Sequence, residues 1–230
     1  MKRLFILTCF ASLSVVAVAG VLDETVSAVS DYRFRGISQS NLQPGLANQI
    51  EFTSDDGFWL GNKFNSISKQ EYPGIGLEAD VYGGYTHQFD NGWKIYLGDY
   101  EYTYGGATKF NTNEVFAQLR VPYLTFKYYR SMSDYFAAAN SVGNQYFSLD
   151  NYLPIEEITF ISHVGYTKSP LNGASYADWR VGPSYTFCGI ELALNYYWNS
   201  GLSLNQKKAY TADSHELYKN AFVLSIGKSW

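Results

Sequence analysis

The sequence predicts an all-β protein, a transmembrane up-and-down antiparallel β-barrel of about 12 strands. Three observations support this prediction. Apolar and polar residues alternate with a period of two along most of the chain, the connections alternate between short and long, and the last segment ends in an aromatic residue, Trp230. In a barrel the last strand pairs with the first, so that no open sheet edge remains.

Period-two alternation gives the predicted strands and their two faces. In the segment 190–198, for example, Ile190, Leu192 and Leu194 lie opposite Glu191 and Asn195. Segments of about 9–11 residues suit strands that cross a membrane at a tilt. In the segment 93–104 acidic residues share the apolar face, which predicts a bulge near Gly98. The predicted strands are 25–36, 46–54, 58–67, 75–89, 93–104, 112–121, 123–131, 145–152, 157–167, 176–187, 190–198 and 217–230.

The connections between these strands show a regular asymmetry. Every second connection is a short turn, and the others are longer and polar, as in barrels with periplasmic turns and extracellular loops. An exported soluble β-sandwich would explain the alternation but not this asymmetry or the 18% aromatic content. The short turns are 55–57, 90–92, a break at Pro122, 153–156 and 188–189; the long loops are 37–45, 68–74, 105–111, 132–144, 168–175 and 199–216.

The first residues predict a cleaved signal peptide, residues 1–19, followed by one barrel domain, residues 20–230. Lys2 and Arg3 precede an apolar run, and residues 17–19 form an A-x-A cleavage site. The run is too short for a comfortable membrane anchor helix. Removing Lys2 and Arg3 takes the formal net charge from −4 to −6, which argues against nucleic-acid binding. Cys188 is then the only cysteine, so an internal disulfide is impossible.

Charged residues on the polar faces of the strands are predicted to line the pore. A charge that faces lipid at mid-membrane is unfavourable by a few kcal/mol, so these side chains should point inward. They can neutralise one another in a narrow, filled lumen, they can form a constriction that sorts solutes by charge, and both can hold at once. Their signs are mixed, so no ion preference is predicted. The candidates are Asp31, Arg33, Arg35, Glu51, Lys63, Glu78, Asp80, Glu114, Arg120, Lys127, His163, Asp178 and Arg180.

The aromatic residues allow two interpretations. Tryptophans near predicted strand ends are typical of the interfacial girdles of membrane barrels. Alternatively, aromatic side chains inside the pore could stack against sugar rings. Tyr100, Tyr102, Tyr104 and Tyr129 are the candidates for such a track, and the girdle candidates are Trp59, Trp93, Trp179, Trp198 and Trp230.

Catalysis and metal binding find little support in the sequence. The three histidines, His87, His163 and His215, do not lie at metal-ligand spacing. No G-x-S-x-G or similar signature selects a Ser–His–acid set. We therefore expect no catalytic residues, no metal and no cofactor. A barrel enzyme acting on lipids or peptides remains one alternative, and a non-conducting barrel with binding loops remains another.

The stretch from Val29 to Gly45, VSDYRFRGISQSNLQPG, resembles the opening motif of the TorF porin family, also called the Gcw_chp family of proteobacterial proteins. Weaker similarity continues in 128–136, in 162–166, around Asp178 and in the closing LSIGKSW. The resemblance extends over residues 24–230 and implies an outer-membrane β-barrel that acts as a porin. Gly36 is among the matched motif positions, together with Asp31, Arg33 and Arg35.

The expected function is a narrow passive channel for small hydrophilic solutes in the bacterial outer membrane. A barrel of 12 strands lies between side-chain-filled barrels of about eight strands and open porins of about 16–18. The expected partners are outer-membrane lipid, and the barrel-assembly machinery and periplasmic chaperones during biogenesis. Trp230 resembles the C-terminal signal that this machinery recognises.

Overall fold

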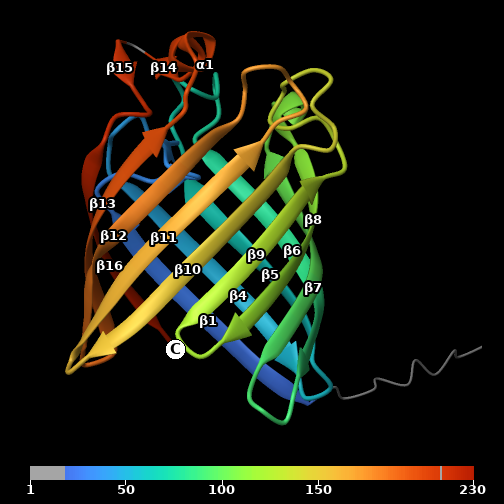
Figure 1. The fold of residues 1–230 in the computed structure, drawn as a ribbon, viewed down its shortest axis with the longest axis vertical. Helices are drawn as coiled ribbons and strands as arrows, with labels where there is room; N and C mark the ends of the chain where they lie inside the picture. The colour runs from blue at the N-terminus through green and yellow to red at the C-terminus, as the bar shows by residue number, and fades with distance from the viewer. Residues whose placement is uncertain (1–18, 213) are drawn as a thin grey trace, which may run out of the picture.

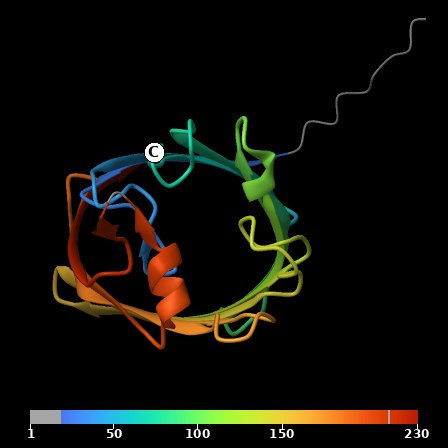
Figure 2. The same ribbon diagram turned by 90° about the horizontal axis from the view of Figure 1, so that it is seen from above.

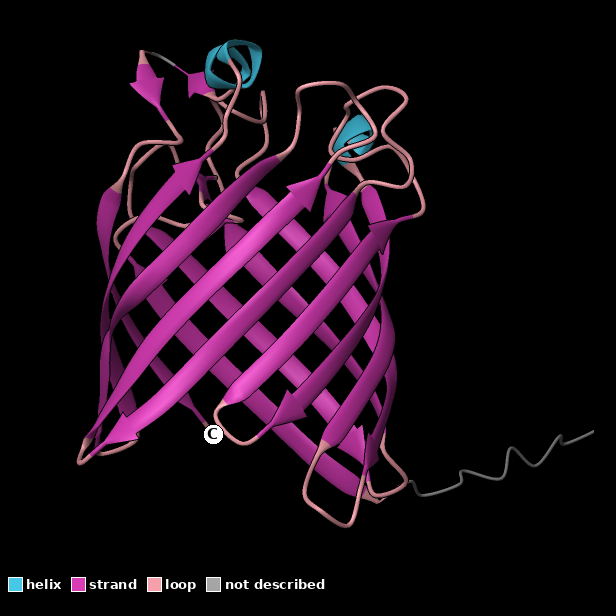
Figure 3. Cartoon of the chain, in the orientation of Figure 1, coloured by secondary structure: helices cyan, strands magenta, loops and turns pink. Residues whose placement is uncertain are grey.

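The computed structural model describes residues 19–212 and 214–230, and residues 1–18 of the expected signal peptide lie outside this part. Within the described residues, twelve strands close into one antiparallel barrel (Figures 1 and 3), which confirms the predicted fold class. They are β1 (Gly20–Val29), β4 (Gly45–Ser54), β5 (Phe58–Ser66), β6 (Leu77–Gln88), β7 (Lys94–Tyr104), β8 (Thr112–Val121), β9 (Leu124–Ser131), β10 (Gln145–Ile155), β11 (Ile158–Lys168), β12 (Tyr176–Phe187), β13 (Ile190–Ser200) and β16 (Ala221–Ser229).

The ring closes because β1 pairs with β4 on one side and with β16 on the other. Short turns join the strands at one end, and long connections join them at the other, as predicted (Figure 1). The turn at Cys188-Gly189 has positive φ at both residues, which matches the twist of a two-residue hairpin. The turn expected at 153–156 lies instead at Glu156-Glu157, because β10 and β11 remain paired as far as Ile155 and Ile158.

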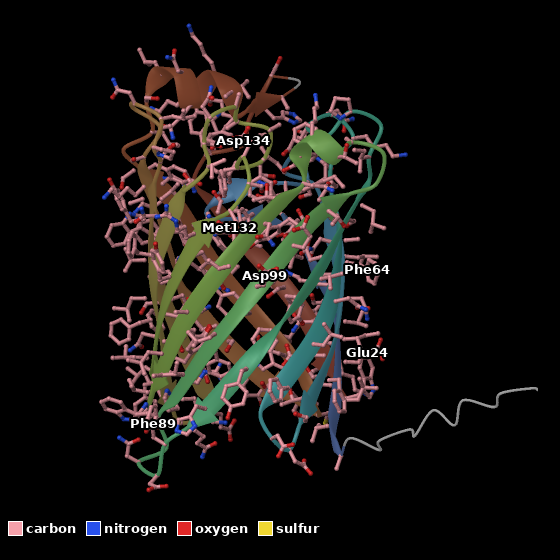
Figure 4. The ribbon with its side chains drawn as sticks, turned by 90° about the vertical axis from the view of Figure 1, so that its right-hand side faces the viewer. Glu24, Phe64, Phe89, Asp99, Met132 and Asp134 are labelled. Carbon is pink, nitrogen blue, oxygen red and sulfur yellow. The ribbon has the colours of Figure 1, made fainter. Side chains whose placement is uncertain are left out.

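The outward face of the barrel is apolar. Leu60 is 63% exposed and Phe222 is 70% exposed, although both are large hydrophobic side chains. Figure 4 shows Phe64 projecting from the outer wall. A broad exposed apolar surface on a closed barrel is the surface expected to contact lipid. Within the described residues, no helix is long and apolar enough to cross a membrane.

The bulge predicted near Gly98 is absent from the described strands. The register of β6 and β7 runs without interruption, and Gly84 lies opposite Gly98. Asp99 and Glu101 therefore stay on the outward face, and Asp99 accepts hydrogen bonds from Asn113 Nδ2 at 2.8 and 3.0 Å. Figure 4 shows Asp99 on the outer wall. A side-chain amide thus satisfies this outward carboxylate without a change of register.

The first strand ends at Val29, so the prediction of a strand over 25–36 is wrong in its second half. Residues 30–44, here called the inward segment, turn into the lumen and contain a small hairpin of β2 (Arg33–Phe34) and β3 (Ile37–Ser38). Two features break the strand. Arg35 and Gly36 take φ of 46° and 80°, and the Asp31 carboxylate accepts a hydrogen bond from Ser38 Oγ at 2.6 Å.

The remaining short elements lie on the long-loop end of the barrel. A 3-10 helix covers Thr108–Phe110, α1 covers Leu204–Ala209, and β14 (Thr211–Ala212) and β15 (His215–Glu216) form a second small hairpin. Seen from above, the inward segment and the loop that carries α1 lie inside one side of the ring (Figure 2). The loops therefore cover part of the mouth rather than extending away from it.

Candidate functional site: a constricted lumen

The inward segment crosses the lumen and is anchored on the far wall by an ion pair. Arg35 Nη2 lies 2.6 Å from Oε2 of Glu114 on β8, and both side chains are almost completely buried. Arg35 Nη1 donates to the hydroxyl of Tyr135 at 2.9 Å. The guanidinium also lies 4.1 Å from the ring centroid of Tyr146, within cation–π distance. Arg35 thus joins the segment after β1 to the opposite side of the barrel.

Other contacts hold the segment near its origin. The Tyr176 hydroxyl donates to the Arg35 carbonyl at 3.2 Å, and the Ser38 N–H donates to the Leu217 carbonyl at 3.0 Å. Arg33 Nε donates to Asp31 at 2.6 Å. The segment is therefore fixed by walls on both sides, and its two arginines each pair with a carboxylate within the lumen.

The course of the inward segment through the lumen requires a glycine at position 36. This requirement gives a first testable prediction. Its φ is 80°, and a Cβ there would lie 2.3 Å from Asn199 Nδ2 and 2.8 Å from Asp178 Cβ. Gly36→Ala should therefore displace the inward segment while the barrel still forms. We expect limited trypsin digestion to cleave after Arg33 or Arg35 in the variant, with the wild-type segment protected.

Gly74→Ala is the matched control. Gly74 has a similar φ of 83°, but nothing lies within 4 Å of its Cβ position. This variant carries the same backbone penalty without the steric clash, so its inward segment should stay protected. Equal cleavage of both variants, or of neither, would contradict a role for close packing at Gly36.

The two faces of the inward segment line different cavities. Phe34 and Ile37 line a cavity of about 530 Å³ on the loop side, here called the vestibule. Asp31 and Arg33 line a cavity of about 640 Å³ on the side of the short turns. A third cavity of about 830 Å³, here called the lower chamber, lies against β4–β9. Within the described residues, the vestibule shares no lining residue with the other two cavities, and the inward segment contributes residues to cavities on both of its sides.

Below the segment, a cluster of charges surrounds Asp150 on β10. Its carboxylate lies 3.0 Å from Lys127 Nζ, 2.7 Å from His163 Nδ1 and 3.5 Å from Arg180 Nη2. The other ring nitrogen of His163 lies 3.0 Å from Oδ1 of Asp178. A doubly protonated imidazole can donate to both carboxylates, whereas the neutral ring can donate to only one. We call these five residues the Asp150 cluster.

A second polar group lies on β6, beside the inward segment. The Glu78 carboxylate accepts hydrogen bonds from Tyr32 (2.9 Å), Asn65 (2.8 Å) and Tyr104 (2.5 Å). Asp80 accepts from the Tyr100 hydroxyl at 3.1 Å. Tyr32 belongs to the inward segment, so this group forms a third anchor. In the described part of the chain, no three His, Cys, Asp or Glu side chains are placed to hold a metal ion.

The structure brings most of the predicted pore residues together in these groups. Asp31, Arg33 and Arg35 are on the inward segment rather than on a strand of the barrel. Glu51, Lys63 and Arg120 line the lower chamber. The sequence analysis missed Asp150 and Tyr135. Asp150 could have been found, because it shares strand parity with Ser148 in the predicted strand 145–152. Tyr135 lies in a loop, where no periodicity indicates its direction.

The aromatic candidates form a ladder along the inner wall. Tyr82 stacks on Tyr100 with centroids 5.0 Å apart, and Tyr100 lies 4.5 Å from Tyr102. Tyr102 in turn packs against Phe34 at 5.5 Å and Phe136 at 5.3 Å, both of which line the vestibule. The ladder therefore passes from the lower chamber to the vestibule beside the inward segment.

Trp59 was expected in an outer girdle, but it is buried inside the barrel. Its ring lies 6.0 Å from that of Tyr82 and 5.8 Å from that of Phe116. Gly84 and Gly98 make this possible, because a Cβ on either would lie 2.6 Å from the indole. Trp179 and Trp198, by contrast, stack on each other at 5.8 Å on the outward face, as a girdle requires.

Comparison with known proteins gives a clear family match. The sequence matches the family described as "Bacterial protein of unknown function (Gcw_chp)" over residues 17–230. The chain belongs to the Gcw_chp family. No curated protein matches this Gcw_chp chain.

Solved structures share the fold of this Gcw_chp barrel. The KdgM porin in complex with disordered oligogalacturonate is 10% identical, with a TM-score of 0.55, and the match covers 91% of this chain and 98% of that one. The NanC porin is 12% identical, with a TM-score of 0.53, and the match covers 91% and 99%. At these identities the likeness establishes a porin-like barrel and no more.

One acidic residue of the Gcw_chp barrel is packed in a loop above the inward segment. Glu71, in the connection between β5 and β6, accepts a hydrogen bond from the Asn41 N–H at 2.7 Å. Burial raises the pKa of Glu71 from 4.5 to about 8, and the nearby Asp31 charge adds to this, whereas the hydrogen bond from Asn41 opposes it. Glu71 therefore keeps its proton up to about pH 8 while the loop is packed, whereas it loses the proton near pH 4.5 when the loop is released.

The pKa of Glu71 gives a prediction with a definite sign. A carboxyl whose pKa is raised by packing stabilises the packed state fully below pH 4.5, and this contribution is lost as pH rises through about 8. Hydrogen exchange in residues 67–76 should accelerate between pH 5 and pH 9 beyond the intrinsic base catalysis. Glu71→Gln should remove this additional acceleration of hydrogen exchange. If the additional acceleration persists in that variant, a titratable group other than Glu71 causes it.

Proposed function

We propose that this protein is an outer-membrane porin that forms a narrow passive channel for small hydrophilic solutes. The observation that carries the proposal is the inward segment, held inside a lumen that still contains cavities on both sides of it, and the cavities on the short-turn side are lined largely by polar residues. A barrel filled by its side chains would leave no such cavities. A porin of about 16–18 strands, by contrast, would enclose a wider aqueous channel. The segment would limit solutes mainly by size, since its charges are paired.

Two features support location in the outer membrane, the apolar outer face of the barrel and the signal peptide that the sequence predicts. In this proposal the chain reaches the membrane through the barrel-assembly machinery and periplasmic chaperones, and Trp230 is its recognition signal. The outer partner of the folded protein is lipid. Passage is driven by the solute gradient alone, with no cofactor or energy coupling.

Conductance in planar lipid bilayers tests the proposal. The purified, folded protein should give small, discrete current steps with weak ion selectivity, because Arg35 pairs with Glu114 and Arg33 with Asp31. Folding is verified independently by the shift in electrophoretic mobility of the unheated barrel. A folded protein without ion conductance would contradict the channel and favour a barrel whose loops bind a ligand.

No observation favours a barrel enzyme. Both nitrogens of His163 lie within hydrogen-bond distance of carboxylates, and Nε2 also lies 3.0 Å from the Tyr146 hydroxyl. None of these contacts activates a serine or cysteine nucleophile. Turnover of a lipid or peptide ester by the purified protein would reverse this conclusion.

A further inference from the structure

The vestibule has the size and construction of a small-molecule site. Its volume of about 530 Å³ lies within the range of about 300–1,000 Å³ typical of ligand pockets. The inward segment forms its floor through Phe34 and Ile37, and four loops form its walls through residues such as Phe110, Phe136 and Tyr210. Residues distant in sequence therefore converge on one cavity at the long-loop end of the barrel, the end that we expect to face the outside of the cell.

Seven of the eighteen residues that line the vestibule are aromatic, and several of their rings are set at steep angles to one another. Tyr72 and Phe110 meet edge to face at 5.1 Å, and Tyr135 and Phe136 do so at 4.5 Å. Tyr210 meets Tyr176 edge to face at 6.4 Å. Rings arranged in this way are locked by one another, so they can accept the flat face of a ligand without rearranging.

The charge of the lining selects a neutral ligand. Among the described residues that line the vestibule there is no lysine or arginine, and Glu71 is the only acid. Because its pKa is about 8, Glu71 is mostly protonated at neutral pH. An anion would lose its hydration there without gaining a counter-charge. The protonated carboxyl and the amide of Gln70 instead offer hydrogen bonds at the edge of an aromatic cavity.

We propose that the vestibule binds a short neutral saccharide from outside the cell. A sugar ring presents an apolar C–H face that stacks on aromatic rings and a rim of hydroxyls that pairs with amide and carboxyl groups. The site lies at the upper end of the aromatic ladder, because Phe34 and Phe136 both contact Tyr102. Binding goes beyond the proposed channel, since it does not require that the barrel conduct.

Titration calorimetry on the folded protein in detergent tests the proposal. The probes are three neutral trisaccharides, maltotriose, cellotriose and mannotriose, against trigalacturonate, an acidic trisaccharide of equal ring number. At least one neutral trisaccharide should bind, at least tenfold more tightly than the acidic one. Binding of none of them, or tighter binding of trigalacturonate, would overturn the proposal.

Variants of one loop locate the site. Tyr210→Ala removes a lining ring and should weaken neutral-saccharide binding about three- to tenfold, the loss expected for one aromatic stack. Tyr210→Phe should retain most of the affinity, because it keeps the ring. Tyr123→Ala is the matched control, since Tyr123 is exposed in the short turn between β8 and β9, at the opposite end of the barrel, and does not line the vestibule. An equal loss in Tyr123→Ala would place the site elsewhere.

The two proposals fail separately. A protein that binds the saccharide but gives no current in bilayers would refute the channel and leave this site intact. A protein that conducts but binds none of the neutral probes would refute this site and leave the channel intact.

Discussion

Arg35→Ala should open the constriction and make the channel prefer cations. The substitution removes the ion pair with Glu114 at 2.6 Å and the cation–π contact with Tyr146 at 4.1 Å. Loss of one partner from a buried pair is unfavourable by about 3–5 kcal/mol, because the remaining charge is left without compensation. The inward segment can relieve this penalty by leaving the lumen, which lets water reach Glu114. Single-channel conductance should rise severalfold, and the reversal potential in a salt gradient should shift toward cation selectivity.

Three further variants separate charge from packing. Arg130→Ala removes an arginine that shares the outward face of β9 with the exposed Phe126, so it changes net charge equally and should leave conductance unchanged. Arg35→Lys keeps the charge and should restore most of the ion selectivity. In Arg35→Ala with Glu114→Ala, conductance should stay high while selectivity returns toward the wild-type value. Unchanged currents in Arg35→Ala would show that the segment does not limit flow.

Asp150→Asn should have the opposite effect on selectivity. Asp150 is the only carboxylate within 4 Å of Lys127 and Arg180 among the described residues. Neutralising it leaves two cations on the inner wall without a partner, so the channel should shift toward anions. Because both cations are partly exposed, the loss of stability should be about 2 kcal/mol, between the values for exposed and buried pairs. Reversal potentials and urea unfolding measure the two effects.

Asp90→Asn is the matched control for this change. Asp90 lies in the exposed turn between β6 and β7 and lines none of the cavities described above. The variant has the same charge change and should alter neither selectivity nor the urea midpoint. If Asp150→Asn behaves like this control, solutes do not pass close to the Asp150 cluster.

The strand pattern could be predicted because side-chain direction in a strand depends only on parity. Glu114, Asp178 and Arg180 could thus be assigned to the lumen from their neighbours alone. The inward segment could not be predicted in this way. Its residues 31–35 alternate between charged and aromatic types just as a strand would, so local pattern cannot distinguish the two. Whether these residues continue the strand or turn into the lumen depends on Glu114, which is 79 residues distant from Arg35 in sequence.

The same limit explains the misassigned tryptophan. Trp59 lies near the end of a strand, and position alone suggests an outer girdle. Its inward direction depends on space left by Gly84 and Gly98 on neighbouring strands. The sequence contains these glycines, but only the register of β5, β6 and β7 shows that they lie beside the indole.

The anchoring of the inward segment also has a consequence for the order of folding. The segment follows the first strand, yet several of its partners come late in the chain: Ser38 N–H bonds to Leu217, and Ser30 N–H bonds to Leu224 on β16. A nascent barrel that lacks its C-terminal strands cannot offer these contacts. The segment can therefore complete its contacts only after the chain is complete and the ring has closed. Maturation of the pore would thus be a late, separate kinetic step, with an unrestricted intermediate preceding the constricted product.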